Sequence, residues 1–171
     1  IPPCIHRSSY YFTVLDQKTI VYGLGAIKGV GEAVVMAVVA AREQGGVFKS
    51  LFDFCQRLDL RKLNRRVLEA FIKSGAMDVW QVNRASLEGS LESAVQYAGK
   101  SQQNRETGQF DLFDLLDEQA DTEPDLVQCP AWSTAQRLRG EQDTLGFFLT
   151  GHPAMAYSDE FNAHVKLIAS L

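Results

Sequence analysis

The residues best suited to chemistry in this chain lie at positions 23–31, which read Gly-Leu-Gly-Ala-Ile-Lys-Gly-Val-Gly. Glycines set so closely, ahead of an apolar run at 33–41, let the backbone turn tightly before a helix begins. Peptide N–H groups at such a turn can approach a flat anionic surface, because no side chain stands between them and the anion. The stretch therefore predicts a phosphate-binding turn made by Lys28, Gly29, Val30 and Gly31.

Two other glycine-rich phosphate motifs fail on spacing. A dinucleotide fingerprint needs glycine where Lys28 stands, and a Walker-type loop needs Gly-Lys-Ser/Thr, whereas Val30 follows Gly29. The segment instead resembles the hairpin of a helix-hairpin-helix DNA-binding element, with residues 24–28 as a short first helix and 32–42 as the second. A purely structural turn that packs two helices closely is the alternative interpretation.

The charge distribution supports an anionic partner. The chain has 171 residues and a net charge of −4, but residues 106–125 contain eight acidic residues and no Lys or Arg, so the rest carries +4. Basic side chains gather after the glycine-rich turn, and this is the kind of cluster that neutralises phosphates. A solvated helix face is the alternative. The cluster consists of Arg57, Arg61, Lys62, Arg65, Arg66 and Lys73.

Composition excludes several classes. Apolar residues make up 46% of the chain, yet its longest apolar run is far shorter than the roughly 18 to 20 residues of a membrane span. The chain's cysteines, Cys4, Cys55 and Cys129, lie far apart and suggest neither disulfides nor a zinc site. We expect a cytoplasmic protein with no membrane contact. Because the sequence opens Ile1-Pro2-Pro3 without methionine, we also expect a fragment of a longer chain.

Residue patterns predict a mainly α fold. Two β-branched and aromatic runs, 10–14 and 19–22, predict a short N-terminal β-hairpin. Ser50, Asn64 and Asn83 are predicted to cap successive helices, with Gly75 ending the helix that starts after Asn64. The helix from Glu32 to Arg42 is apolar all round, which predicts a central place in a small bundle.

The same patterns divide the chain into four parts. Residues 1–22 are predicted to form an extended lead-in and the β-hairpin, and residues 23–99 a helix-hairpin-helix duplex-binding domain. Residues 100–130 are polar and then acidic, which predicts a flexible linker without a core. Residues 131–171 are predicted to form a helix and the start of a connection to a further domain.

One apolar island interrupts the predicted linker. Large hydrophobic side chains in a solvated tether reduce solubility unless a partner covers them, so the island predicts a short docking motif. A turn that folds back on its own domain is the alternative. The island is formed by Gln109, Phe110, Asp111, Leu112 and Phe113.

At this point several stretches together resemble one family. The island is similar to the sliding-clamp-binding pentapeptide of bacterial replication proteins. The stretches at 22–31, 48–55, 63–70, 73–78 and 144–153 resemble, in order, the C-terminal fingers region of bacterial C-family replicative polymerases, the family of the DNA polymerase III alpha subunit. The resemblance covers nearly the whole chain.

The resemblance implies a parent DNA-directed DNA polymerase, a nucleotidyltransferase that uses Mg²⁺ held by palm aspartates. Those aspartates do not occur here, so we expect no catalytic residue, no metal site and no cofactor in this chain. The resemblance further implies that the parent binds the sliding clamp (beta subunit) and other replisome subunits. A free-standing repair or recombination module and a protein-interaction domain are the alternatives. We expect non-specific binding of primer-template duplex DNA through the hairpin with Arg61, Lys62, Arg65 and Arg66.

Overall fold

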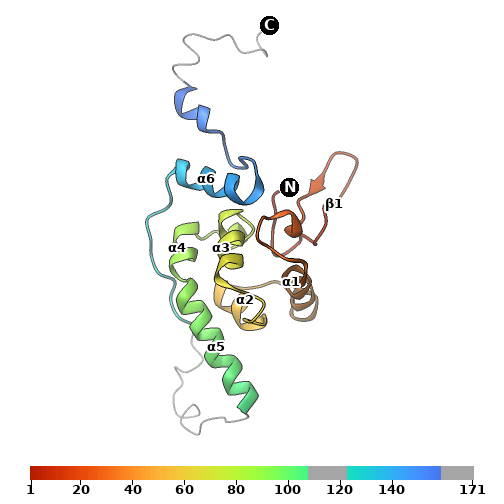
Figure 1. Cartoon of the computed structure of the whole chain (residues 1–171), viewed down its shortest axis with the longest axis vertical. Helices are drawn as coiled ribbons and strands as arrows, with labels where there is room; N and C mark the ends of the chain where they lie inside the picture. Colours follow the sequence, from red (N-terminus) through yellow and green to blue (C-terminus); the bar gives the residue numbers. More distant parts are fainter. Residues whose placement is uncertain (108–122, 159–171) are drawn as a thin grey trace.

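The computed structural model describes residues 1–107 and 123–158, and Figure 1 shows their arrangement. The described part is mainly helical, with a two-stranded antiparallel hairpin near its start, so the predicted fold class is confirmed. Helix α3 lies between α4 and α1 in this view, α5 extends downward and α6 lies above. The elements in chain order are β1 Thr13–Val14, β2 Ile20–Val21, η1 Leu24–Ala26, α1 Glu32–Gly45, α2 Leu51–Arg57, α3 Arg65–Lys73, η2 Asp78–Trp80, α4 Arg84–Gly89, α5 Leu91–Thr107, α6 Thr134–Leu145 and η3 Pro153–Tyr157.

The hairpin strands are shorter than predicted. Only Thr13 and Val14 pair with Val21 and Ile20. The turn begins directly after them, where the N–H groups of Leu15 and Asp16 donate to the carbonyl of Thr19. The first helix of the helix-hairpin-helix element is likewise reduced to the single 3₁₀ turn η1.

Helix α1 does not occupy the central position predicted from its apolar sequence. Its buried residues are Val34, Val35 and Val38, whereas Met36 is 55% exposed. An alanine-rich and valine-rich helix can be apolar on every side and still pack along one face, because small side chains cost little when they remain in water. The helix therefore lies at the edge of the domain.

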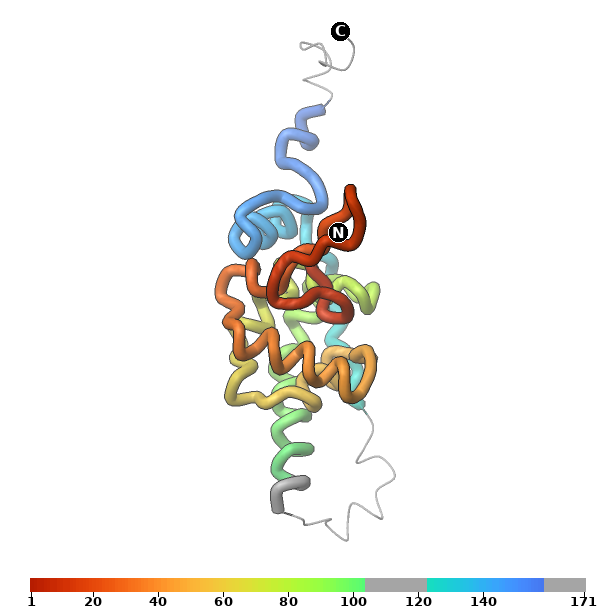
Figure 2. Tube along the Cα trace, turned by 90° about the vertical axis from the view of Figure 1, so that its right-hand side faces the viewer, coloured from red at the N-terminus to blue at the C-terminus, as the bar shows by residue number. Residues whose placement is uncertain are grey.

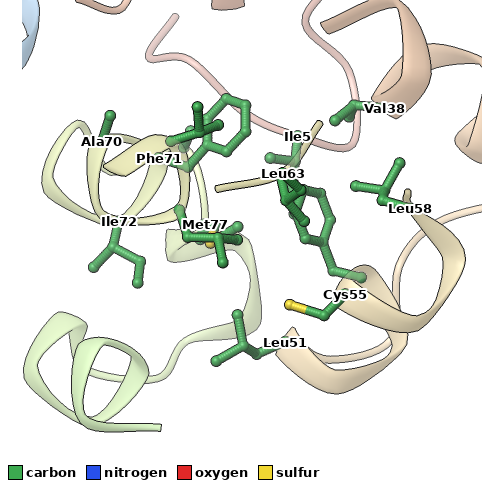
Figure 3. Packing of buried hydrophobic residues seen from close by; sticks show 14 of the residues in the cluster. Ile5, Val38, Leu51, Cys55, Leu58, Leu63, Ala70, Phe71, Ile72 and Met77 are labelled. Atoms are coloured by element: carbon green, nitrogen blue, oxygen red, sulfur yellow. The ribbon is translucent and has the colours of Figure 1, made fainter. Parts of the chain in front are cut away.

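Capping side chains place α2 and α3 as predicted. The Ser50 hydroxyl accepts the N–H of Asp53 at 3.0 Å, and the Asn64 side chain accepts the N–H of Val67 at 3.1 Å. Gly75 ends α3 in the left-handed region at φ +79°. Figure 3 shows the resulting core, in which Cys55 and Leu51 of α2 face Met77 and α3. Cys55 is fully buried in this core, and its burial raises the pKa of its thiol to about 12.

The helix predicted to begin after Asn83 is two helices. Helices α4 and α5 meet at Ser90, whose hydroxyl donates to the carbonyl of Ser86 at 2.8 Å. Helix α5 then continues to Thr107, so residues 100–107 are helical rather than part of a linker. Polar side chains hold this stretch against α2, because Gln102 donates to the carbonyl of Leu58 at 2.8 Å.

The described residues after the gap also belong to the folded unit. The N–H groups of Val127 and Cys129 donate to the hydroxyls of Ser90 and Ser86 at 2.8 and 3.0 Å. We call residues 123–130 the strap. The strap leads into α6, which packs on α3 and buries Leu138. The structure thus joins 23–99, 123–130 and α6, which the sequence divided among three parts.

A buried ion pair holds α6 in place. The Arg84 guanidinium contacts Asp78 at 2.7 Å and the fully buried Glu141 at 3.1 Å, and also donates to the carbonyl of Lys73. Burial alone would raise the pKa of Glu141, but hydrogen bonds from Thr150 and Leu149 and the charge of Arg84 lower that pKa below its ordinary value of 4.5. A charge buried in this way stabilises the fold only while its partners remain.

We predict that acid weakens the fold through Glu141. Because its folded-state pKa lies below the unfolded value, its contribution is complete above about pH 4.5 and is lost as the pH falls through the folded value. Glu141→Gln should lower the free energy of unfolding at pH 7 by about 3 kcal/mol, since Arg84 loses a buried charge partner. Denaturant unfolding between pH 3 and 7 measures both effects.

The variant should also lose less stability than the wild type on acidification. The exposed glutamate Glu43 provides a control, because Glu43→Gln should change stability by less than about 0.5 kcal/mol. Equal pH profiles for wild type and Glu141→Gln would contradict the assigned role of Glu141.

Candidate nucleic-acid interface

The turn before α1 is built around one buried side chain between two exposed glycines. Val30 is 7% exposed and belongs to the core, while its N–H donates to the carbonyl of Ile27 at 3.1 Å. Gly29 is exposed and adopts φ +88°, in the left-handed region that favours glycine. This conformation turns the backbone outward on both sides of Val30.

The exposed glycines provide unused hydrogen-bond donors. Within residues 1–107 and 123–158, the N–H groups of Gly29 and Gly31 donate no hydrogen bond. The N–H groups of the first turn of α1, at Glu32 and Ala33, lack intrahelical partners as at every helix start. These donors lie at the positive end of a 14-residue helix, which favours an anion.

Val30 differs from its neighbours, because its N–H is already paired inside the turn. Of the three amides that the sequence suggested, those of Gly29 and Gly31 remain available. Val30 fixes the turn to the core through its side chain.

The glycines of the 23–31 stretch differ in whether the described chain requires them. A Cβ on Gly23 would lie 2.5 Å from the carbonyl oxygen of Tyr10, and one on Gly25 would lie 2.4 Å from the Tyr10 ring. Gly31, by contrast, has an ordinary extended backbone at φ −86°, and nothing lies within 4 Å of a Cβ built there. The described chain itself gives no reason for glycine at position 31.

The two charged side chains next to the turn have opposite effects on an anion, because Lys28 would attract it and Glu32 would repel it. Lys28 is exposed, and its side chain has no partner in the described part of the chain. Its N–H donates to the carbonyl of Thr144 at 2.8 Å, which ties the turn to the end of α6. Glu32 begins α1 and adds a negative charge that the amides and Lys28 must outweigh.

Two members of the basic cluster have structural roles. Arg57 donates to the carbonyls of Ala41, Gly46 and Val47, and its guanidinium lies 4.4 Å from the centre of the Phe48 ring. Lys73 lies within 3.8 Å of Glu69 and 3.5 Å of Glu88. These two side chains hold helices together rather than stand ready for a ligand.

The other four basic residues are exposed and fall into two kinds. Arg61 pairs with Asp59 at 3.0 Å, and Arg65 pairs with Glu69 at 2.8 Å. Hydrogen bonding from Arg61 lowers the pKa of Asp59, and hydrogen bonding to Glu69 raises the pKa of Arg65. Exposed pairs of this type contribute about 0 to 1 kcal/mol, so a phosphate can replace the carboxylate at little cost. Within the described residues, the side chains of Lys62 and Arg66 have no partner.

The backbone of the turn before α1 and the backbone of the segment that leads into α3 lie toward the same edge of the view in Figure 2. Figure 3 shows Val38 of α1 near Leu58 and Leu63, which flank the segment leading into α3. We call the surface formed by Lys28, Gly29, Gly31, Arg61, Lys62, Arg65 and Arg66 the phosphate face.

Sequence reasoning missed the support that α6 gives to this face. The contact runs from Lys28 to Thr144, across more than 100 positions, and its donor and acceptor are backbone atoms that no side-chain pattern reveals. The Ser133 and Gln136 capping box at the start of α6 was readable from their spacing. The predicted clamp-binding residues 109–113 lie outside the described residues.

Residues 1–107 and 123–158 lack two other kinds of feature. No group of three or more His, Cys, Asp or Glu side chains within 1–107 and 123–158 could hold a metal ion. In the same residues, no helix combines the length and apolarity needed to cross a membrane.

Comparison with known proteins agrees with the turn and its setting. A family described as the helix-hairpin-helix motif matches residues 1–87, half of the chain. The chain belongs to the helix-hairpin-helix family. It is 45% identical over 167 residues to the DNA polymerase III subunit alpha of Vibrio cholerae, a match that covers 97% of this chain and 14% of that protein.

Two further relatives give the same picture. The chain is 45% identical over 166 residues to the DNA polymerase III subunit alpha of Escherichia coli K12, with 96% of the chain and 14% of that protein covered. It is 40% identical over 186 aligned positions to that of Pseudomonas aeruginosa, with 99% of the chain and 16% of that protein covered. The chain thus spans about one seventh of the length of these relatives and is homologous to that segment of them.

We predict that Gly31→Ala leaves the fold intact and weakens binding to duplex DNA. The backbone at Gly31 is ordinary and the space around it is open, so the added methyl group meets no atom of the described chain but intrudes on a bound phosphate. Affinity should fall about tenfold, which corresponds to about 1.4 kcal/mol. A fluorescence-anisotropy titration with a labelled duplex measures it.

Gly46→Ala provides the control, because it changes a second exposed glycine, at φ +73°, that lies at the opposite end of α1 from the turn. Gly46→Ala should cost stability through backbone strain but leave duplex affinity unchanged. Full affinity in a folded Gly31→Ala protein would contradict close approach at position 31.

Proposed function

We propose that this chain forms part of a replicative DNA polymerase, in which it holds the newly made duplex without sequence preference and connects the enzyme to its sliding clamp. One observation carries the DNA-binding half of the proposal. The turn at 29–31 presents two unpaired amides at a helix start beside Lys28, and the glycine at 31 is unexplained by the described chain itself.

The proposed contacts are all to the DNA backbone. The amides of Gly29 and Gly31 would bind one phosphate, with Lys28 beside it, while Lys62 and Arg66 would bind phosphates further along the duplex. Arg61 and Arg65 would exchange their carboxylate partners for phosphates. Since phosphate contacts carry no base information, this mode of binding suits an enzyme that must copy any template.

The second half of the proposal concerns the clamp. Gln109, Asp111, Leu112 and Phe113 match the residue types of a clamp-binding pentapeptide, with Phe110 at its variable position. The described residues on either side of this segment support the idea, because α5 before it and the strap after it both pack on the domain that bears the phosphate face. A motif carried between them would tether the clamp close to the bound duplex and lengthen its residence.

The polymerase reaction itself is proposed for the full-length protein and assigned to other residues. Nucleotidyl transfer of this kind needs carboxylates that hold divalent metal ions such as Mg²⁺. The described residues contain no cluster of ligands that fits them. We therefore derive no catalytic step from this chain, and we place the protein in the bacterial cytoplasm with its template and the other replisome subunits.

We predict that Lys62→Ala with Arg66→Ala weakens duplex binding and reduces its dependence on salt. Each lost phosphate contact lowers the slope of log K against log salt by about 0.9, so the double variant should lose about 1.8. Titrations at several salt concentrations measure the slope. For the wild type at physiological salt, we expect a dissociation constant of about 10⁻⁴ to 10⁻⁶ M, which is typical of non-specific binding.

The matched control removes the same charge elsewhere. Lys18 lies in the β-hairpin turn and Lys100 on α5, so Lys18→Ala with Lys100→Ala changes the net charge equally but leaves the phosphate face intact. Its slope should stay near that of the wild type. Equal slopes for the two double variants would show that binding follows net charge rather than this surface.

We further predict that Leu112→Ala with Phe113→Ala abolishes measurable binding to the sliding clamp. Burial of two such side chains in a partner contributes about 1.5 to 3 kcal/mol each, which is most of the affinity of a short peptide. Gln109→Ala should do less damage. Calorimetry with purified clamp measures binding, and an unaltered duplex affinity in the same variant confirms that the rest of the chain is intact.

Clamp affinity unchanged by the double substitution would refute the docking motif. A large drop in melting temperature would instead place Leu112 and Phe113 in the core of this chain. Neither result would bear on the phosphate face, so the two halves of the proposal are tested separately.

A further inference from the structure

The two-stranded hairpin bears an apolar face that is exposed at Val14, Ile20 and Phe12. Strand register places Val14 opposite Ile20 and Phe12 opposite Tyr22, so these four side chains share one face of the sheet. Val14 is 71% exposed, Ile20 55% and Phe12 54%. We call this the hairpin face.

Aromatic contacts continue this face toward the end of α6. The ring of Phe12 lies 4.7 Å from that of Tyr22, and Tyr22 lies 5.8 Å from Phe147, which is 42% exposed. These apolar side chains form a continuous row over two strands and a loop, in contrast to the single exposed hydrophobic residues that are common on protein surfaces. Such a patch marks a surface that binds another segment of protein.

Backbone hydrogen bonds show which segment already approaches it. The amino group of Ile1 donates to the carbonyl of Ile20 at 2.8 Å, and the N–H of Tyr22 donates to the carbonyl of Ile1 at 3.0 Å. In parallel strands, one residue bonds in this way to the residues on either side of its partner, which here is Val21. Ile1 therefore lies at the outer edge of β2 where a residue of a parallel strand would lie.

That edge has one donor left for a longer strand. Leu15 bonds to Thr19 at 2.9 Å, and since bonded and non-bonded pairs alternate, Val14 and Ile20 form a pair whose backbone groups point outward. Within the described residues the N–H of Ile20 donates to no acceptor. A residue two positions before Ile1 in a parallel strand would supply the carbonyl that it lacks.

We propose that the hairpin face is an intramolecular docking surface for the polypeptide that leads into Ile1 in a protein of the relatives' length. That polypeptide adds a strand parallel to β2, takes the Ile20 N–H, and packs apolar side chains on Val14, Ile20 and Phe12. The relatives support the source, because this chain covers only 14% of the Vibrio cholerae protein and the first residue of the chain already lies on the open edge.

The hairpin offers a matched pair of substitutions. Val14 and Leu15 are neighbours, 71% and 66% exposed, but the alternation of an extended chain points them to opposite sides. In the 171-residue chain, Val14→Glu and Leu15→Glu should each leave the melting temperature nearly unchanged, because both side chains are in water. In the full-length polypeptide only Val14→Glu should lower it, by several degrees.

Hydrogen exchange at residues 19–22 tests the strand directly. We expect the Ile20 amide to exchange at least about tenfold more slowly in the full-length polypeptide than in the 171-residue chain, and Val14→Glu but not Leu15→Glu to abolish that protection. Equal exchange in the two proteins would overturn the proposal. So would protection already present in the 171-residue chain, protection that grows with protein concentration, or equal effects of the two substitutions.

Discussion

The burial of Val30 between two exposed glycines is the constraint on which the rest of the candidate interface depends. The side chain fixes the turn to the core, and the Val30 N–H closes it onto the carbonyl of Ile27. Gly29 adopts φ +88° beside Val30, and within the described residues the N–H groups of Gly29 and Gly31 donate no hydrogen bond. A turn anchored in this way presents its donors without further ordering when an anion arrives, which lowers the entropic cost of binding.

The same turn depends on a distant part of the chain. Lys28 bonds to Thr144 at the end of α6, and α6 is held by the buried contact of Arg84 with Glu141. Glu141 in turn accepts the N–H groups of Leu149 and Thr150, so the loop after α6 is fixed to the same centre. The phosphate face, the strap after the undescribed segment and α6 therefore form one structural unit, although a long acidic stretch separates them in sequence.

Local features of this fold were predictable because their causes are local. Ser50 and Asn64 cap their helices through bonds to amides three residues ahead, and Gly75 ends α3 by its own backbone angle. The glycine turn and its helix were predictable for the same reason. Apolar periodicity also identified the buried side chains of α2, including Cys55.

What the sequence could not supply depends on distant partners. The burial of only one side of α1 depends on which elements pack against it. Val35 is buried and Met36 is exposed, although both are apolar residues of the same helix and the sequence does not distinguish them. Arg57 is a basic residue that could bind phosphate, but its guanidinium instead donates to nearby backbone carbonyls and lies over the Phe48 ring. The sequence did not predict that residues 100–107 are helical, because polar residues without an apolar stripe resemble a linker. The hydrogen bond from Gln102 to the carbonyl of Leu58, which holds this stretch against the domain, cannot be read from the sequence.

The central claim is that the amides of Gly29 and Gly31 hold a phosphate of duplex DNA. Amide chemical shifts in ¹⁵N-labelled protein, followed during titration with a short duplex, test it at the atoms concerned. The account predicts large, saturable shifts at Gly29 and Gly31 and smaller ones at Val30, whose N–H stays bonded to Ile27. Shifts confined to Lys62 and Arg66, with the amides of Gly29 and Gly31 unmoved at saturation, would contradict it.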